Sequence, residues 1–205
     1  MAAAVSPPSK AGWLLNRTAT LLFRLLGWKA EGTFPALTHF VAIAAPHTSY
    51  WDAFYMIAVA CIFNIRFSWM VKNSAMFFPL NVIIRFFGGI PIDRSARRDV
   101  VAQAVDRFRS SETLYLAVSP EGTREYADHW KTGFYHIACE ARVSIVFGYV
   151  DFGRKAAGLG PIFQPTGDIE ADFKVFERFY SHVTPRYPEC RGRVVPRQPA
   201  RESAA

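Results

Sequence analysis

The stretch from His47 to Asp52 (HTSYWD) has residue types and spacing suited to a general base and its orienting partner. A histidine and an aspartate separated by four residues can meet where a loop turns into a helix. The Asp52 carboxylate can then accept the imidazole Nδ1–H and stabilise the imidazolium, which leaves Nε2 free to take a proton from an alcohol. Ser49 and Asp52 also fit a helix capping box. Because short motifs match by chance, this stretch alone favours the capping box.

Two further stretches each follow a predicted strand and end in an arginine. They are residues 89–94 (GIPIDR), which end in Arg94, and residues 119–124 (SPEGTR), which end in Arg124. The carboxyl ends of parallel strands meet at one edge of a sheet, so we expect both arginines beside His47. Guanidinium groups bind phosphate in a bidentate manner, and two of them would form an anion site. The alternative is that each arginine pairs with a neighbouring carboxylate in a surface salt bridge, which contributes little.

In this order and spacing, the three stretches resemble the motif blocks of the glycerolipid acyltransferases, the family that includes 1-acylglycerol-3-phosphate acyltransferase. The His-x4-Asp block matches His47 to Asp52, and the Ile-Asp-Arg block matches Ile92 to Arg94. The Pro-Glu-Gly-Thr-Arg block matches Pro120 to Arg124 at every residue. The resemblance covers roughly residues 38 to 150. One block is weak evidence, whereas three in order are strong.

The resemblance implies transfer of an acyl group from an acyl thioester, acyl-CoA or acyl-ACP (acyl carrier protein), to a hydroxyl of a phosphate-bearing glycerolipid. The acceptor would most simply be the lysophospholipid lysophosphatidate, in phospholipid biosynthesis. His47 would be the general base, and Asp52 would orient it and stabilise its charge. The residues that the resemblance places around the acceptor phosphate are Arg94, Arg124, Lys72, Glu121, Gly122 and Thr123. It implies no metal, no cofactor beyond the thioester co-substrate and no covalent acyl-enzyme.

Some features depart from the family's pattern. The fourth block usually holds a proline in a Val-Pro-like strand, whereas this chain has VSIVFG at residues 143–148. Pro91 replaces the more usual aromatic or apolar residue of the second block. Lys131-Thr132-Gly133, in contrast, resembles the Lys-x-Gly that follows the third block. These differences leave the reaction type intact, but the acceptor could also be a non-glycerol lipid.

Alternating apolar segments predict the elements that must position these residues. We expect strands at residues 39–45, 67–71, 90–92, 113–118 and 144–150, with a hairpin or edge strand at 158–165. We expect helices at residues 13–28, 52–63, 75–87 (broken at Pro79), 97–109, 133–141 and 169–183. Strands that alternate with helices predict a single α/β domain with a largely parallel central sheet flanked by helices.

Composition predicts a membrane surface as a partner. The 205 residues carry a formal net charge of +7, and 51% of them are hydrophobic. This balance suits an anionic phospholipid surface better than a nucleic acid. The Leu-rich helix at residues 13–28 would lie in the membrane plane or pack in the core. No apolar run reaches the roughly 20 residues that a membrane span needs, so we expect a cytoplasmic enzyme that is peripheral on the inner face of the cell membrane.

The expected domain organisation is simple. Residues 1–12 would be a flexible start, residues 13–184 the acyltransferase domain, and residues 185–205, rich in Pro and Arg, a disordered basic tail.

Other classes of function have less support. The chain has no G-x-S-x-G elbow, P-loop or G-x-G-x-x-G motif, which disfavours a serine hydrolase and a nucleotide-binding enzyme. His129, His136 and Cys139 lie close in sequence, but such a group without carboxylates is more often structural than metal-binding. A non-catalytic lipid-binding or membrane-tethering module is the alternative, and the His47–Asp52 pair is what would distinguish an enzyme from it.

Overall fold

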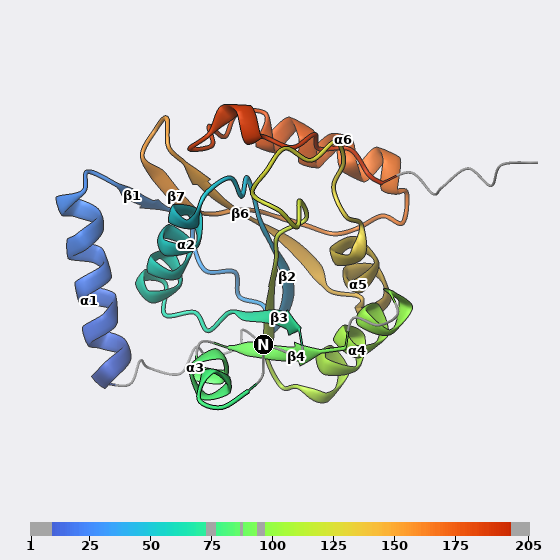
Figure 1. Cartoon of the computed structure of the whole chain (residues 1–205), viewed down its shortest axis with the longest axis horizontal. Helices are drawn as coiled ribbons and strands as arrows, with labels where there is room; N and C mark the ends of the chain where they lie inside the picture. Colours follow the sequence, from blue (N-terminus) through green and yellow to red (C-terminus); the bar gives the residue numbers. More distant parts are fainter. Residues whose placement is uncertain (1–9, 73–76, 87, 94–96, 198–205) are drawn as a thin grey trace, which may run out of the picture.

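A mostly parallel sheet forms the centre of the molecule (Figure 1). The computed structural model describes residues 10–72, 77–86, 88–93 and 97–197. Within these ranges seven strands form one sheet in the order β1-β7-β6-β2-β5-β3-β4, in which β6 and β7 are antiparallel and the other pairings are parallel. The strands are β1 (Lys29–Glu31), β2 (His39–Ala44), β3 (Ser68–Lys72), β4 (Gly89–Ile92), β5 (Leu114–Val118), β6 (Ser144–Asp151) and β7 (Ala156–Phe163). The predicted α/β fold with a largely parallel sheet is therefore confirmed.

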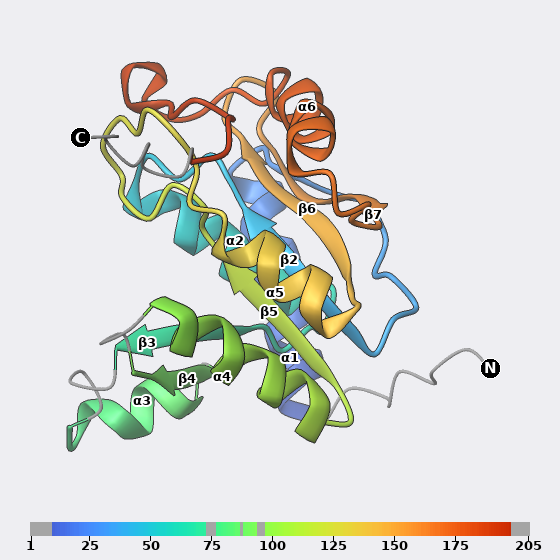
Figure 2. The same ribbon diagram turned by 90° about the vertical axis from the view of Figure 1, so that its right-hand side faces the viewer.

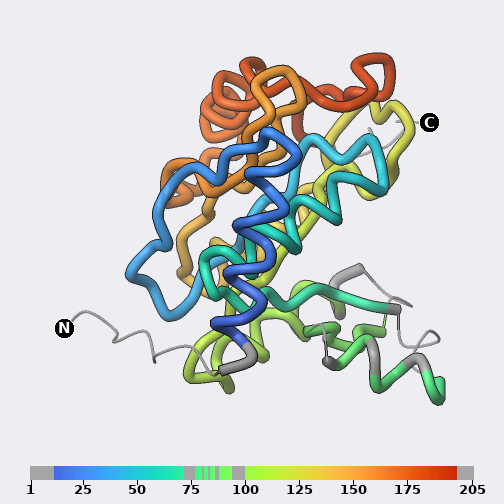
Figure 3. Tube along the Cα trace, turned by 90° about the vertical axis from the view of Figure 1, so that its left-hand side faces the viewer, coloured from blue at the N-terminus to red at the C-terminus, as the bar shows by residue number. Residues whose placement is uncertain are grey.

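Helices cover both faces of this sheet (Figures 2 and 3). On one face α2 packs on the strands, and α1 lies outside α2. On the other face lie α4, α5 and α6. The helices are α1 (Lys10–Leu25), α2 (Tyr50–Ile62), α3 (Leu80–Phe86), α4 (Arg97–Ser110), α5 (Gly133–Ala141) and α6 (Ile169–Tyr180).

The side-chain alternation of β2 explains the two layers. Phe40 and Ala42 are fully buried in a cluster with Ile65, which follows α2. Val41 and Ile43 point the other way, into the large cluster built with α4, α5 and α6. Since both faces of the central strand are buried, it reads as a continuous apolar run, as expected for a parallel sheet.

The sheet extends one strand further than the sequence predicts. The segment predicted as a hairpin or edge strand is β7, which pairs with β6 as a hairpin and also carries β1 on its other side. Gly32 and Gly158 permit this pairing, because a Cβ on either would overlap the backbone of the opposite strand. Three residues are too short to show a strand periodicity, so the glycines were the usable signal.

Two predicted helix boundaries move for identifiable reasons. α1 ends at Leu25 because Gly27 takes a positive φ of 72°, which stops a helix. α3 begins just after Pro79, where the sequence predicts a break within a longer helix.

The chain after α6 differs from the disordered tail that its composition predicts. Pro188–Cys190 forms a 3-10 turn, and Arg193 N–H donates to the carbonyl of Ala127 over 2.8 Å. Trp130 N–H donates in turn to the carbonyl of Val195 over 2.9 Å. These bonds supply partners for backbone groups of an irregular loop, which composition alone cannot reveal. Residues 1–9 and 198–205 lie outside the described residues, whereas residues 10–12 belong to α1.

Candidate active site

The loops after β2 and β5 bring the first and third motifs together. β2 and β5 are neighbouring parallel strands, so their carboxyl ends emerge side by side. His47 lies on the first loop, and Glu121 and Arg124 lie on the second. β4, which forms the first four residues of the second motif, lies two strands beyond β5. Arg94 lies outside the described residues.

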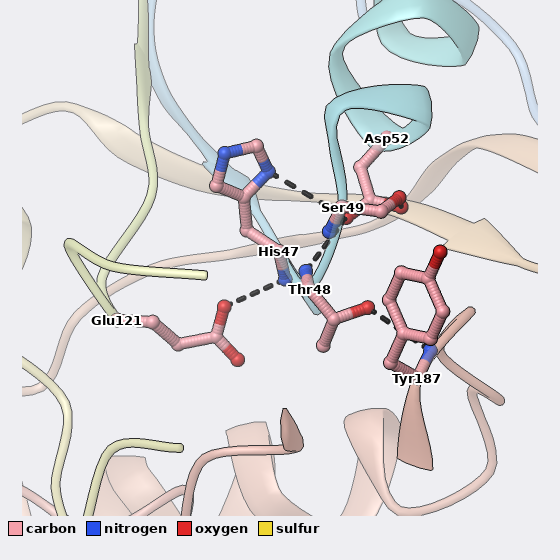
Figure 4. A network of polar contacts seen from close by, with 6 residues as sticks. All are labelled: His47, Thr48, Ser49, Asp52, Glu121 and Tyr187. Atoms are coloured by element: carbon pink, nitrogen blue, oxygen red, sulfur yellow. Dashed lines mark hydrogen bonds and ion pairs between the residues drawn. The ribbon is translucent and has the colours of Figure 1, made fainter. Parts of the chain in front are cut away.

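Asp52 completes the capping box of Ser49 at the start of α2 and is also the partner of His47 (Figure 4). Its buried carboxylate accepts the backbone N–H groups of Thr48 and Ser49, each over 2.7 Å, and the Ser49 hydroxyl over 2.9 Å. Oδ2, the oxygen that accepts the two backbone N–H groups, also lies 3.7 Å from Nδ1 of His47. The two interpretations of the motif are therefore compatible, because one carboxylate meets both geometries.

The surroundings of His47 favour the neutral imidazole. Burial lowers its pKa below the ordinary value of 6.5, the Asp52 carboxylate opposes this effect, and the positive charge of Arg124 lowers the pKa further. A general base has to be unprotonated before it reacts, and it works best when its pKa lies near the working pH. With Nδ1 turned toward Asp52, Nε2 is the nitrogen left to accept a proton.

Glu121 lies behind His47, on the backbone side of that residue (Figure 4). Its buried carboxylate accepts the backbone N–H of His47 over 2.6 Å, and the backbone N–H of Gly192 faces it closely enough to lower its pKa. Burial raises its pKa to about 7, and the His47 N–H bond is the largest opposing influence. The Glu121 carboxylate therefore anchors the loop after β2 through the backbone of His47.

Arg124 is held at the surface by an aromatic partner. Its guanidinium donates to the Tyr50 hydroxyl over 2.8 Å and lies 3.8 Å from the centroid of the Tyr50 ring. A guanidinium has five N–H donors, so this bond leaves others for a ligand. Tyr50 therefore orients Arg124 without consuming its capacity to bind an anion.

A lysine that follows the third motif folds back over it. Gly122 has a positive φ of 65°, and a Cβ on this residue would overlap the Lys131 ammonium. Only glycine therefore combines this backbone with the close approach of Lys131. The next residue, Thr123, accepts the backbone N–H of Glu125 through its hydroxyl over 3.2 Å, which stabilises the turn.

A cavity of about 2100 Å³ opens beside His47. Asp52, Arg124 and Lys131 line its polar part. Apolar side chains from α2, β3 and α4 also line the cavity, among them Ala53, Met56, Ile57, Ala60, Met70 and Val101. The volume exceeds the roughly 300–1,000 Å³ of common small-molecule sites, and the presence of both charged and apolar side chains suits a ligand with a charged head and a hydrocarbon chain.

The sequence of this region matches a known family model. The model, described as Acyltransferase, matches residues 31–147, which is more than half of the chain. The chain belongs to the acyltransferase family. A search of the curated proteins finds no match.

A solved acyltransferase structure shares this fold. It is the 1-acyl-sn-glycerophosphate (LPA) acyltransferase PlsC from Thermotoga maritima, with a TM-score of 0.54 and 18% sequence identity. The match covers 80% of this chain and 74% of that one. At this identity the likeness concerns the fold alone, which agrees with the family assignment.

The acyltransferase fold brings together most of the residues expected at the site. His47, Asp52, Gly122, Thr123 and Arg124 line the cavity. Lys72 is the last residue of β3, at the same edge of the sheet, whereas Glu121 does not belong to the cavity wall.

Two residues of the site were not assigned from the sequence. The side chains of Lys131 and Tyr50 meet the third motif only in the fold, although the Lys-x-Gly pattern was a signal for the lysine. Within the described ranges, no group of three or more His, Cys, Asp or Glu side chains could hold a metal ion.

The pKa of His47 provides a direct test of this electrostatic arrangement. We expect its C–H resonances, followed by NMR, to titrate below 6.5. Arg124→Ala removes a positive charge that lowers the pKa, so the midpoint should move to higher pH. Arg124→Lys keeps the charge and should leave the midpoint nearly unchanged. A midpoint at or above 6.5 in the unmodified protein would contradict this description, and loss of the signal in His47→Ala confirms its assignment.

Proposed function

We propose that this acyltransferase transfers an acyl group from an acyl thioester, acyl-CoA or acyl-ACP, to a hydroxyl of a phosphate-bearing glycerolipid, most simply lysophosphatidate to give phosphatidate. The observation that carries the proposal is the His47–Asp52 pair, with its neutral imidazole on the wall of a cavity lined by both charged and apolar side chains. A lipid-binding module needs the cavity but has no use for a base poised in this way.

The reaction follows from the orientation of His47. Nε2 accepts the proton of the acceptor hydroxyl while that oxygen attacks the thioester carbonyl carbon. The new C–O bond replaces the C–S bond, and the imidazolium returns its proton to the departing thiolate. Asp52 stabilises the imidazolium between these two steps, since its oxygen lies 3.7 Å from Nδ1.

The charges around the polar part of the cavity support a phosphate as the acceptor's head group. Arg124 is oriented by Tyr50, and Lys131 lies over the glycine of the same motif. We propose that Arg124, Gly122 and Thr123 bind the phosphate, joined by Lys72 and Arg94 as the family resemblance implies. Lys131 is a further cation that the fold adds to this part of the wall.

The outer face of α1 supports docking on an anionic phospholipid membrane. Ala19 and Phe23 are buried toward α2, whereas Leu14, Leu21 and Leu25, on the opposite face, are 60%, 58% and 74% exposed. On a helical projection, Arg17 and Arg24 flank this leucine ridge on one side, as expected for a helix that rests at a lipid surface with its cations among the head groups. We propose a peripheral enzyme on the inner face of the cell membrane.

None of the described helices is long and apolar enough to cross a bilayer.

The base assignment predicts the effect of replacing His47. His47→Ala should lower acyl transfer to a lysophospholipid by about 10²–10⁴-fold, the usual contribution of a general base. The exposed His182 provides a matched control, and His182→Ala should keep full activity. Asp52→Asn should also lower activity, and it should lower the free energy of unfolding, because an amide offers one acceptor oxygen where the buried carboxylate offers two. Full activity in a folded His47→Ala protein would disprove the mechanism.

The phosphate assignment predicts a change in acceptor affinity. Arg124→Ala should raise the KM for lysophosphatidate by about ten- to a hundredfold, since hydrogen bonds to charged groups contribute about 1.5–3 kcal/mol. The KM for the acyl thioester should stay within about twofold. Arg109, an exposed arginine on α4, provides the control variant Arg109→Ala. If Arg124→Ala altered only the thioester kinetics, the acceptor phosphate would have to bind elsewhere.

Membrane docking predicts binding to anionic vesicles. The full chain should sediment with vesicles of phosphatidylglycerol and phosphatidylcholine more strongly than with pure phosphatidylcholine. Replacing Leu14, Leu21 and Leu25 together by Asp should reduce partitioning at least about tenfold, because each buried leucine contributes on the order of 1.5–3 kcal/mol. Ile162→Asp, an exposed position on β7, is the control. Unchanged partitioning of the triple variant would show that α1 is not the docking helix.

A further inference from the structure

The segment after α6 passes along the loop that carries the third motif. We define residues 186–197 as the C-terminal strap. Its residues Arg193 and Val195 are hydrogen-bonded to the backbone of Ala127 and Trp130, as described above, and Pro196 forms a parallel bridge with Trp130. Figure 2 shows the strap beside this loop at one end of the molecule. The strap therefore supplies backbone partners to the loop on which Glu121 and Arg124 lie.

The strap also reaches the loop that carries His47. The backbone N–H of Tyr187 donates to the hydroxyl of Thr48 over 3.3 Å, and Thr48 is buried (Figure 4). Arg186, the preceding strap residue, lies with its guanidinium 5.7 Å from the centroid of the Trp51 ring. Both contacts fall within the first motif, on either side of the cap residue Ser49. One short segment thus touches both loops of the site.

Glu121 joins these contacts at a single carboxylate. It accepts the N–H of His47 from the first loop, and Gly192 of the strap packs against it, so that a Cβ on Gly192 would lie 3.4 Å from Cγ of Glu121. We propose that Glu121 and the C-terminal strap position the backbone of His47, which makes Glu121 a positioning residue for acyl transfer and not a ligand of the acceptor phosphate. This inference rests on the function proposed above, because it assigns a role within the same site.

The chemistry of the contact favours a carboxylate. The N–H of His47 donates to Glu121 and the N–H of Gly192 lies near it. An ionised carboxylate only accepts hydrogen bonds, so both of its oxygens can serve. A glutamine would offer one oxygen, and its NH₂ group would face an N–H donor. The positive charge of Arg191, also in the strap, favours the ionised form. A phosphate, by contrast, would be repelled by this carboxylate, and Glu121 is absent from the cavity wall.

The fit of the strap against Glu121 is close. A Cβ on Gly192 would lie 3.1 Å from the carbonyl oxygen of Ala127 and 3.4 Å from Cγ of Glu121. A larger residue at position 192 would therefore push the strap away from the carboxylate by a few tenths of an ångström. A displacement of that kind would loosen the hold on His47 without altering any group that touches a substrate.

A positioning role predicts a change in kcat and not in KM. Small misplacements of a reacting group cost up to about a hundredfold in rate, so Glu121→Gln should lower kcat by about ten- to a hundredfold. The KM values for acyl thioester and lysophosphatidate should both stay within about twofold. The control is Glu125→Gln, the same substitution at an exposed carboxylate of the same loop. It should leave the kinetics unchanged.

Amide hydrogen exchange tests the same contact without any assay of activity. In the full-length protein, the amides of His47 and Gly192 should exchange slowly, and Glu121→Gln should accelerate both together. Glu125→Gln should accelerate neither. Because hydrogen exchange needs no substrate, it tests whether Glu121 and the strap hold the backbone of His47 even if the protein acts on a different acceptor or on none.

Two milder variants cover the case in which Glu121→Gln fails to fold. Thr48→Val keeps the side-chain shape but removes the acceptor of the Tyr187 N–H, and Gly192→Ala displaces the strap. Each should lower kcat about threefold to tenfold with unchanged KM values, and each should accelerate exchange at His47.

Three results would overturn the proposal. The first is unchanged exchange at the His47 amide in Glu121→Gln. The second is a raised lysophosphatidate KM with unchanged kcat in that variant, which would make Glu121 an acceptor ligand. The third is an unchanged kcat in both Thr48→Val and Gly192→Ala, which would show that the strap does not act on the base.

Discussion

The carboxylate of Asp52 is the group on which the geometry of the site depends. It lies in the first turn of α2 and accepts two backbone N–H groups that precede the helix, so it fixes where the helix begins. The partial positive charge of a helix N-terminus also favours a carboxylate there. The same oxygen faces Nδ1 of His47. Since the cap holds the carboxylate in place, the imidazole meets a partner whose position is set before any substrate binds, as preorganised catalysis requires.

Two buried carboxylates on either side of His47 create an energetic problem that backbone donors solve. Burying an ionised carboxylate costs several kcal/mol unless it is hydrogen-bonded. Asp52 accepts the N–H groups of Thr48 and Ser49, and Glu121 accepts that of His47. The loop has no regular structure in which these N–H groups could be paired. The buried carboxylates therefore give the N–H groups an acceptor, and the N–H groups stabilise the buried charges. The cost of burying the ionised form is visible at Glu121, because burial raises the pKa of its carboxyl group to about 7.

The sequence was informative wherever the chemistry is local. His47 and Asp52 are five positions apart on one turn, and the alternating apolar segments specified the parallel sheet that places the third motif beside them. The sequence does not show in which direction the side chain of a loop residue points. Glu121 belongs to a motif associated with the acceptor phosphate, yet its carboxylate faces the backbone of His47. Contacts between irregular segments leave no periodicity either, so the composition of residues 185–205 predicts a disordered tail although the structure has the hydrogen-bonded strap there.

The apolar wall of the cavity and the proposed docking surface share one helix. Leu15 of α1 lines the cavity, whereas Leu14 and Leu21 lie on the outward ridge. In the proposed orientation on the membrane, the part of the cavity that α1 lines would lie next to the lipid from which a lysophospholipid has to come. Its hydrocarbon chain would then pass from one apolar environment to another, at little cost in exposed area. The phosphate would have to cross to Arg124, so the cations of the polar part would draw the head group in while α1 holds the enzyme at the source of its substrate.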